Sequence, residues 1–164
     1  MKGKKELSGK ISISGSKNAT LPILAASILA KQVRITNIPL VKDIFTMVEL
    51  LNFIGLKIKI IKNKKMIEIT NSNKNINTLA PYKLVKTMRA GVLVLGSLLS
   101  KYGKAKVSLP GGCAIGTRPV DLHLFALKKL GAKIKIKSGY ILAEAKNGLK
   151  GTNIRFPSIS VGAT

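Results

Sequence analysis

The chain has 164 residues, of which 46% are hydrophobic and 21% charged, and this composition indicates a globular domain and excludes a disordered chain. Its formal net charge of +23, from 29 Lys and Arg against 6 Asp and Glu, has two interpretations: a nucleic-acid-binding surface, or biased residue usage, since nearly all basic residues are lysines scattered along the chain. The single cysteine excludes an intrachain disulfide and a cysteine-rich metal cluster, and it is compatible with a reducing cytoplasm.

The predicted elements begin with residues 10–14, where isoleucine alternates with polar residues in the pattern of a strand. After a turn at residues 15–18, the almost wholly apolar residues 19–30 predict a buried helix. This apolar stretch is far shorter than the roughly 20 residues that span a bilayer and it starts late, so we expect no membrane segment and no targeting signal. A short strand is predicted at residues 33–36, before Pro39 breaks the chain.

The remaining elements follow the same order in both halves of the chain. Helical spacing of apolar residues predicts helices, and alternating stretches predict strands and hairpins. Glycines end the second helix of each half. The predicted elements are a helix at 42–54 ended by Gly55, a hairpin of 57–61 and 66–70, a helix at 84–99, a strand at 104–109, a helix at 120–130 ended by Gly131, and a hairpin of 133–137 and 140–145.

The two halves also share residues. Residues 55–60 match residues 131–136 at an offset of 76, whereas Pro39 and Pro110 are only 71 residues apart, so about five extra residues (76 − 71) follow Pro110. Because repeated elements build the scaffold and unmatched loops carry function, we expect the site at residues 111–115.

Each half is predicted to form a βαβαββ unit, at about residues 15–75 and 82–146. A third unit begins at residue 151, with a predicted strand at residues 152–156. Helices in such units must cover a sheet face, so the predicted fold class is α/β.

Two helix starts carry candidate anion-binding residues. Lys17 and Asn18 stand before an apolar helix, where backbone N–H groups, an ammonium and an amide suit an anion, although the stretch also fits an ordinary capped turn. Arg89 stands at nearly the equivalent place in the second unit, since residue 17 shifted by 71 falls at residue 88. A guanidinium there can bind a phosphate or carboxylate with two hydrogen bonds; the alternative is a surface arginine.

The glycine-rich loop after Pro110 carries the single cysteine. Cys113 is either a small buried apolar residue or, with Arg118 and many lysines nearby, an exposed acidified thiol that donates a proton or acts as a nucleophile. No histidine and aspartate partners of a hydrolase triad are evident, so acid–base chemistry is favoured over acyl transfer. Asp121 fits the first turn of a helix, and His123 fits ordinary packing.

These residues resemble the family of UDP-N-acetylglucosamine 1-carboxyvinyltransferases, which belong to the EPSP synthase-like enolpyruvyl transferases. Four stretches carry the resemblance: residues 16–26, 84–90, 107–123 and 160–164. The Gly-Gly-Cys loop followed by Arg-Pro-Val-Asp-Leu-His is specific, and the resemblance covers essentially the whole chain. It implies repeated βαβαββ units of the inside-out α/β barrel fold of enolpyruvyl transferases, here incomplete.

The resemblance implies transfer of the enolpyruvyl group from phosphoenolpyruvate to the 3-hydroxyl of UDP-N-acetylglucosamine, the first committed step of peptidoglycan synthesis, in the cytoplasm. It implies that Cys113 is the catalytic proton donor and the target of fosfomycin, and that Lys17 and Asn18 bind phosphoenolpyruvate. The residues that it matches to UDP-N-acetylglucosamine contacts are Arg89, Arg118, Pro119, Val120, Asp121, Leu122, Ser158, Ile159, Ser160 and Val161. It implies no cofactor and no metal, and the chain departs from the family pattern at Ser158, where a lysine or another polar residue is common.

The resemblance further implies an N-terminal fragment whose partner is the missing C-terminal half of the same enzyme. Residues 1–14 are then a strand that belongs with the missing domain, residues 15–164 are a partial domain, and the general base lies beyond Thr164. We expect the fragment alone to be inactive, with neither nucleic acid nor membrane as a partner. Three alternatives stay open: the sister transferase that acts on shikimate 3-phosphate, a basic nucleic-acid-binding module, and a decayed product without activity.

Overall fold

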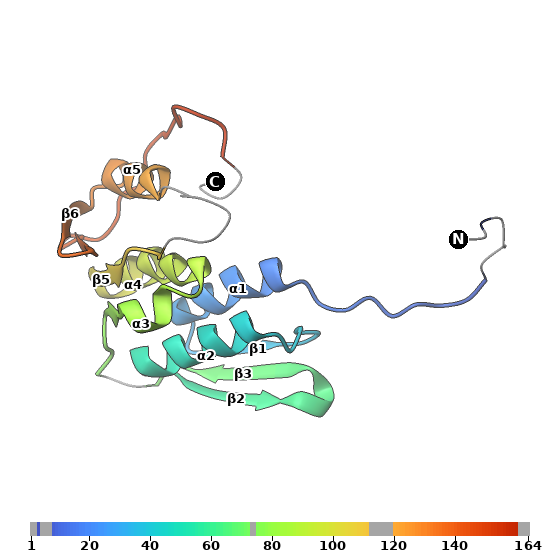
Figure 1. Ribbon diagram of the computed structural model, residues 1–164. Coiled ribbons are helices and arrows are strands. Elements are labelled where there is room, and N and C mark those ends of the chain that lie inside the picture. The colour runs from blue at the N-terminus through green and yellow to red at the C-terminus, as the bar shows by residue number, and fades with distance from the viewer. Residues whose placement is uncertain (1–2, 4–7, 73–74, 112–119, 161–164) are drawn as a thin grey trace.

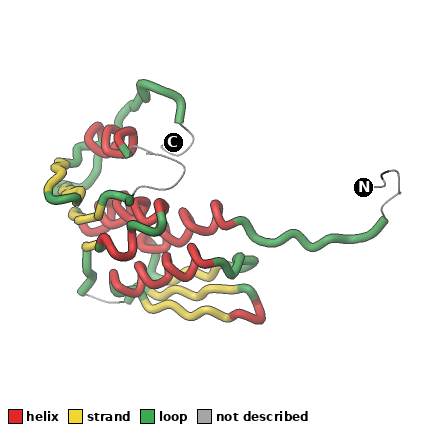
Figure 2. The backbone as a smooth tube through the Cα atoms, in the orientation of Figure 1, coloured by secondary structure: helices red, strands yellow, loops and turns green. Residues whose placement is uncertain are grey.

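The computed structural model of the chain describes residue 3 and residues 8–72, 75–111 and 120–160. Within these residues the chain forms two sheets, with most of its helices packed together beside them (Figure 1). Residues 8–16 run as a loop away from this body, as the tube in Figure 2 shows.

The first half of the chain forms two helices and a three-stranded antiparallel sheet. The hydroxyl oxygen of Ser16 accepts a hydrogen bond from the Ala19 N–H at 3.3 Å and so caps the first helix. The three strands pair in the order β1–β3–β2, which we call sheet A. The elements are α1 (Lys17–Ala26), the 3-10 turn η1 (Ser27–Leu29), β1 (Gln32–Ile35), α2 (Lys42–Ile54), β2 (Lys57–Ile61), η2 (Lys62–Lys64) and β3 (Met66–Thr70).

The second half forms a four-stranded sheet in the order β4–β5–β7–β6, which we call sheet B. Strand β4 runs parallel to β5, and the other two pairs are antiparallel. Ser138 and Gly139, with φ of 50° and 75°, form the two-residue turn between β6 and β7, whose positive angles match the twist of a hairpin. The elements are β4 (Leu79–Ala80), α3 (Tyr82–Val85), η3 (Arg89–Leu93), α4 (Val94–Tyr102), β5 (Lys104–Ser108), α5 (Asp121–Lys129), β6 (Lys133–Lys137) and β7 (Tyr140–Glu144).

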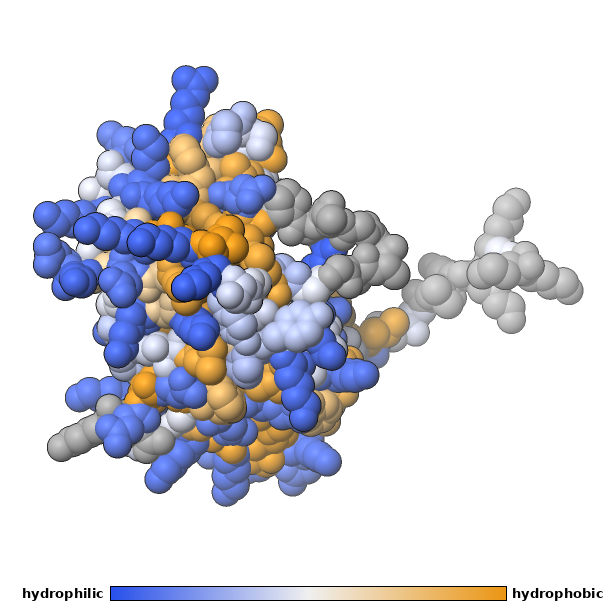
Figure 3. All heavy atoms as spheres, turned by 60° about the vertical axis from the view of Figure 1, so that its left-hand side comes forward, coloured by the Kyte–Doolittle hydropathy of each residue, from blue (hydrophilic) through white to orange (hydrophobic). Residues whose placement is uncertain are grey.

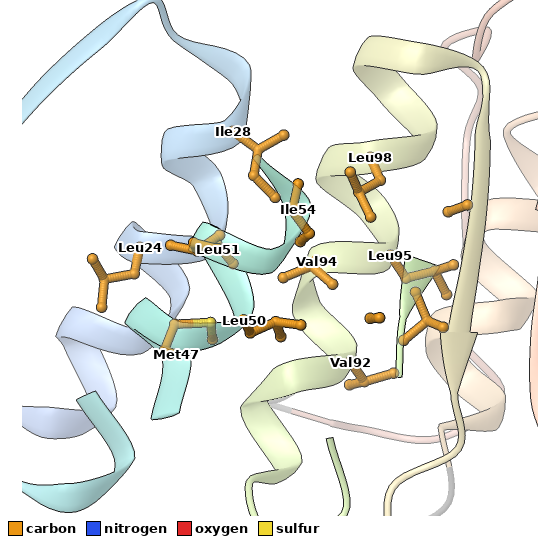
Figure 4. Packing of buried hydrophobic residues seen from close by; sticks show 14 of the residues in the cluster. Leu24, Ile28, Met47, Leu50, Leu51, Ile54, Val92, Val94, Leu95 and Leu98 are labelled. Atoms are coloured by element: carbon orange, nitrogen blue, oxygen red, sulfur yellow. The ribbon is translucent and has the colours of Figure 1, made fainter. Parts of the chain in front are cut away.

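The main core lies where α1, α2 and α4 meet. Helix α1 contacts both α2 and α4, while α2 contacts β2 of sheet A and α4 contacts β5 of sheet B. Figure 4 shows side chains of these helices interdigitating, among them the fully buried Leu24, Leu51 and Leu98. Burying an aliphatic side chain of this size contributes roughly 1.5–3 kcal/mol, so the helix cluster is the main source of stability. Helices α1, α2 and α4 thus form the inner layer, with sheet A against α2 and sheet B against α4.

Several predicted elements are confirmed within one residue. The helix predicted at residues 42–54 is α2, and Gly55 ends it in the left-handed region with φ of +117°. The strand predicted at 104–109 is β5, and both predicted hairpins form. These elements have strong local patterns, namely helical spacing of apolar residues or strict alternation beside turn residues.

Three strand and helix predictions are wrong for the described residues. Residues 10–14 and residues 152–156 form loops instead of strands, because no neighbouring strand pairs with them here. The helix predicted at 84–99 is broken: Met88 is extended, with φ −140° and ψ 106°, and only α4 continues as an α-helix. Burial of the Met88 side chain, which is 3% exposed, outweighs the local helix preference.

Candidate active site

Lys17 opens α1 and is paired with an acidic residue from the neighbouring helix. Its Nζ lies 2.8 Å from Oδ2 of Asp43, which stands in the first turn of α2. The two side chains are 47% and 36% exposed, so the pair faces solvent. Helix α1 has no acidic residue in its own first turn, and the positive end of its dipole therefore adds to the charge of Lys17. Asn18 follows at an exposed position of the same turn.

Arg89 opens η3 in the second unit. Element η3 contacts both α1 and α2, the helices that carry Lys17 and Asp43. The Arg89 residue is half-buried, whereas Lys17 is exposed. The elements that carry the two predicted cations therefore pack against each other.

The loop that carries Cys113 leaves the folded body beside the segment that leads to Arg89. Gly111 is the last described residue before the loop, and a Cβ added to it would lie 3.0 Å from the carbonyl oxygen of Lys86. A larger residue at position 111 would push the loop away from Lys86, so glycine fits this close approach. Lys86 precedes Arg89 by three residues, and the loop thus starts next to the candidate anion site.

Four predicted site residues lie outside the described residues. They are Cys113, Arg118, Pro119 and Val161.

Val120, Asp121 and Leu122 lie together at the start of α5. Val120 is buried and precedes the helix, and its carbonyl oxygen accepts a hydrogen bond from the Leu124 N–H at 3.1 Å. Asp121 is exposed in the first turn, where its charge is favourable for the helix dipole, as predicted.

An aromatic contact ties α5 to the last described segment of the chain. The rings of Phe125 and Phe156 lie 6.2 Å apart between centroids, in a tilted arrangement. Phe156 is followed by Ser158, Ile159 and Ser160, of which the first two are exposed. The contact therefore brings the two stretches predicted to bind the sugar nucleotide to neighbouring parts of the structure.

Sequence reasoning missed Asp43, because its partner Lys17 lies 26 residues away in the chain. The available signal was an acidic residue at the start of a predicted helix, which local capping already explains. His123 was expected to be ordinary packing; the residue is half-buried, and its buried Nδ1 has no hydrogen-bond partner among the described residues.

The solvent-facing side of sheet B is strongly basic. Lys133 and Lys135 of β6 are exposed, and Lys104 and Lys106 of β5 point to the same face. Figure 3 shows long hydrophilic side chains projecting from this side of the molecule, with apolar atoms between them. Glu144 lies opposite Lys104 and Lys133 in the strand register, and it is the only acidic residue in the described strands of this sheet. The positive electrostatic field of these lysines attracts small anions as well as polyanions.

Three surface hollows between described residues contain none of the predicted site residues; they are lined mainly by residues 75–78, by β1 and β3, and by residues 144–150. In the part of the chain that the structure describes, no three His, Cys, Asp or Glu side chains are grouped closely enough to hold a metal ion. No described helix is both long and apolar enough to cross a membrane.

The curated relatives described here carry the same name. The chain is 60% identical over 163 residues to UDP-N-acetylglucosamine 1-carboxyvinyltransferase of Pelagibacter ubique, which covers 99% of this chain and 38% of the relative. It is 56% identical over 159 residues to the enzyme of the same name from Rickettsia rickettsii (strain Sheila Smith), which covers 96% of this chain and 38% of that relative. The chain therefore spans little more than a third of the length of these relatives.

Solved structures share the fold at low sequence identity. The enolpyruvyl transferase NikO from Streptomyces tendae superimposes with a TM-score of 0.72 at 22% identity, covering 90% of this chain and 32% of that protein. An EPSP synthase from Acinetobacter baumannii gives a TM-score of 0.71 at 18% identity, over 94% of this chain and 36% of that protein. The sequence profile of the EPSP synthase (3-phosphoshikimate 1-carboxyvinyltransferase) family matches residues 1–164. With the profile matching throughout and the fold shared, the chain belongs to the EPSP synthase family of enolpyruvyl transferases.

Proposed function

We propose that this chain forms part of the active site of an enzyme that transfers the enolpyruvyl group from phosphoenolpyruvate to the 3-hydroxyl of UDP-N-acetylglucosamine. The hydroxyl oxygen bonds to C2 of phosphoenolpyruvate while C3 gains a proton. The resulting tetrahedral intermediate loses phosphate from C2 and a proton from C3, which leaves the enol ether. Both relatives described above carry the name of this activity, which supports the proposal.

One observation carries the proposal: Lys17, fixed by Asp43, stands on a helix that packs against the element of Arg89. Phosphoenolpyruvate carries a phosphate and a carboxylate, and two fixed cations suit these groups. In the proposal Lys17 and Asn18 bind phosphoenolpyruvate, and Arg89 contacts the substrates from η3. Asp43 keeps the Lys17 ammonium at the start of α1.

Cys113 is proposed as the acid that protonates C3. Its loop begins at Gly111, which lies beside Lys86, three residues before Arg89. An acidified thiol suits a site that must give up a proton, and the same thiol is proposed as the residue that fosfomycin alkylates. The proposed contacts to UDP-N-acetylglucosamine are Arg89, Arg118, Pro119, Val120, Asp121, Leu122, Ser158, Ile159, Ser160 and Val161.

The remainder of the relatives' length is proposed to complete the enzyme. It would supply the base that removes the proton from the sugar hydroxyl, and the strand at residues 1–14 would belong with it. Residues 15–164 then form a partial domain that needs this partner for turnover. In this proposal the enzyme works in the cytoplasm on peptidoglycan precursors, without a metal or a cofactor.

A chimera tests the proposal. This chain replaces the matched part of the Pelagibacter ubique enzyme, and phosphate release is measured with phosphoenolpyruvate and UDP-N-acetylglucosamine together. We expect turnover by the chimera and none by the 164-residue chain alone. In the chimera, Cys113→Ala should lower kcat at least about 100-fold, the usual contribution of a positioned general acid.

Two outcomes would contradict the proposal. Phosphate release by the 164-residue chain alone would show that no partner is needed. A chimera with a native circular dichroism spectrum and no turnover would show that this chain has lost the activity of its relatives. Shikimate 3-phosphate serves as the control acceptor, and we expect no turnover with it.

A further inference from the structure

The outer faces of the two sheets can be compared position by position, because the hairpins of both units pair in the same register. Strand β2 corresponds to β6 at the offset of 76, and β3 corresponds to β7. In sheet A, Glu68 at the centre of the outer face forms an ion pair with Arg34 at 3.0 Å. In sheet B the equivalent position is Leu142, which lies between Lys106 and Lys135 in the register. An apolar residue thus replaces the acid, and the lysines beside it keep their charge.

The outer face of sheet B, called here the basic face, consists of the residues that alternate with the buried Ala105, Val107, Ile141 and Ala143. Within the described strands it carries five lysines and one acid, which are Lys104, Lys106, Lys133, Lys135, Lys137 and Glu144. The centres of protein–protein interfaces are depleted of lysine, and burying an ammonium without a partner is costly. This face is therefore suited to remain in water in a longer enzyme as well, and to meet an anionic partner.

Two of the three tyrosines of the chain lie together at one end of the basic face. Nζ of Lys106 lies 4.8 Å from the ring centroid of Tyr140, and Nζ of Lys86 lies 5.4 Å from that of the exposed Tyr82. The Tyr82 N–H donates a hydrogen bond to the Tyr140 hydroxyl oxygen at 3.4 Å. In sheet A the position of Tyr140 is taken by Met66. Lysines beside aromatic rings are the combination with which proteins bind single-stranded nucleic acids.

A polar hollow lies at the other end of β5. It has a volume of about 540 Å³ and is lined by residues 75–78, Tyr102 and Lys104. The side-chain amides of Asn75 and Asn77 and the hydroxyl of Thr78 can both donate and accept hydrogen bonds, which suits the 2′-hydroxyl groups of RNA. Strand β5 has five residues and is therefore about 13 Å long. The tyrosines and the hollow thus lie within the reach of one short strand of nucleic acid, since site sizes start at about four nucleotides.

Lysines scattered along the sequence favour biased residue usage over a nucleic-acid partner, but folding gathers five of them beside two tyrosines. We propose that the basic face binds single-stranded RNA. The lysines contact the phosphates, Tyr140 and Tyr82 stack on bases, and the polar hollow binds 2′-hydroxyl groups. A duplex keeps its bases stacked inside, so the tyrosine rings require an unpaired strand. The five lysines lie outside the proposed anion site of Lys17 and Arg89, so RNA binding does not depend on the proposed reaction.

Fluorescence anisotropy with a labelled oligouridylate of about 12 nucleotides measures this binding. We expect binding by the chain and by the chimera, with log Kd rising linearly with log salt concentration. Lys133→Gln with Lys135→Gln should lower this slope by about 1.4, because each lost phosphate contact of a single strand contributes about 0.7. The matched control, Lys57→Gln with Lys59→Gln, removes the same charge at the equivalent positions of sheet A and should leave the slope unchanged. Phosphate release by the chimera should be the same in both variants.

Tyr140 tests the stacking. Tyr140→Leu should raise Kd about 5- to 150-fold, the range expected for the loss of one stacked base. Tyr140→Phe keeps the ring and should bind like the unchanged chain, and both variants should keep the circular dichroism spectrum of the unchanged chain. An oligodeoxyuridylate of the same length lacks only the 2′-hydroxyl groups, and it should bind more weakly than the oligouridylate.

Four results would overturn the proposal: no binding of the oligouridylate, equal slopes in the two lysine variants, an unchanged Kd in Tyr140→Leu, or equal affinity for the oligodeoxyuridylate. Equal slopes would mean that net charge alone attracts the probe, and equal affinities would mean that the face does not distinguish RNA from DNA. Vesicles of phosphatidylcholine and phosphatidylserine serve as a second probe. If they bind the chain and the oligouridylate does not, the basic face belongs to a membrane surface instead.

Discussion

At the scale of single residues, the ion pair of Lys17 and Asp43 is the contact through which the proposed anion site can be tested. Both side chains are partly exposed, and solvent screening limits such a pair to roughly 0–1 kcal/mol of stability. In the proposed function, its role is to hold the ammonium at the start of α1. We predict that Asp43→Asn in the chimera raises KM for phosphoenolpyruvate about tenfold, equivalent to about 1.4 kcal/mol. Steady-state kinetics measure this change, and urea unfolding should show a loss below about 1 kcal/mol.

The chain offers a matched control for this substitution. Arg34 and Glu68 form a similar ion pair on sheet A, at 3.0 Å and with partly exposed side chains. Glu68→Gln should leave KM for phosphoenolpyruvate unchanged, because neither residue belongs to the proposed site. An unchanged KM in Asp43→Asn, or an equal rise in both variants, would remove Asp43 from its positioning role.

At the scale of elements, replacing Gly55 or Gly96 with alanine should change the free energy of unfolding in opposite directions. Gly55 ends α2 with φ of +117°, a conformation that costs an L-residue about 1–2 kcal/mol. Gly96 lies inside α4, and an added Cβ there meets no atom within 4 Å. We predict that Gly55→Ala lowers the free energy of unfolding by about 1–2 kcal/mol, and that Gly96→Ala raises it by about 0.5–1 kcal/mol. Urea denaturation with unchanged m-values measures both.

If the free energy of unfolding changed in the same direction in both variants, the different roles given to Gly55 and Gly96 would be contradicted. A loss in Gly96→Ala would mean that the added methyl group disturbs the packing of α4. No loss in Gly55→Ala would mean that α2 ends without help from a left-handed residue.

Elements with a strong local pattern could be predicted from the sequence, and the others could not. Helix α2 was predicted to the residue, because its apolar side chains recur at helical spacing up to a glycine that can take a positive φ. Strand β4 was missed, because two residues have no periodicity and Leu79–Ala80 is a strand only through its pairing with β5. Residues 10–14 have a strand pattern but no partner in the described structure.

The same limit applies to the candidate site. Lys17 and Arg89 could be proposed from charge, helix starts and the internal repeat, which are local or periodic signals. The contribution of Asp43 depends on how α1 packs against α2, and tertiary packing of this kind leaves no trace in a local pattern. The approach of Gly111 to Lys86 is likewise a contact between segments that only folding brings together.

At the scale of the whole molecule, the distribution of charge predicts how stability responds to salt. The chain carries +23, and like charges in a compact state repel one another unless ions screen them. We predict that Tm of the 164-residue chain rises as NaCl increases from about 0.05 M to about 0.5 M, because the screening length falls from more than 10 Å to a few Å. At this size each 1 kcal/mol of relief corresponds to about 2–4 °C, which differential scanning calorimetry resolves.

A variant of β6 shows whether charge repulsion causes this response. Lys133, Lys135 and Lys137 are exposed on one strand, and changing all three to Glu removes six charge units, from +23 to +17. The variant should have a smaller rise in Tm over the same range, because less repulsion remains for salt to screen. An equal rise would mean that salt acts on buried apolar surface instead of on charge. The basic face of sheet B would then be a solvated surface with little influence on folding, and its field would matter only for the approach of anions.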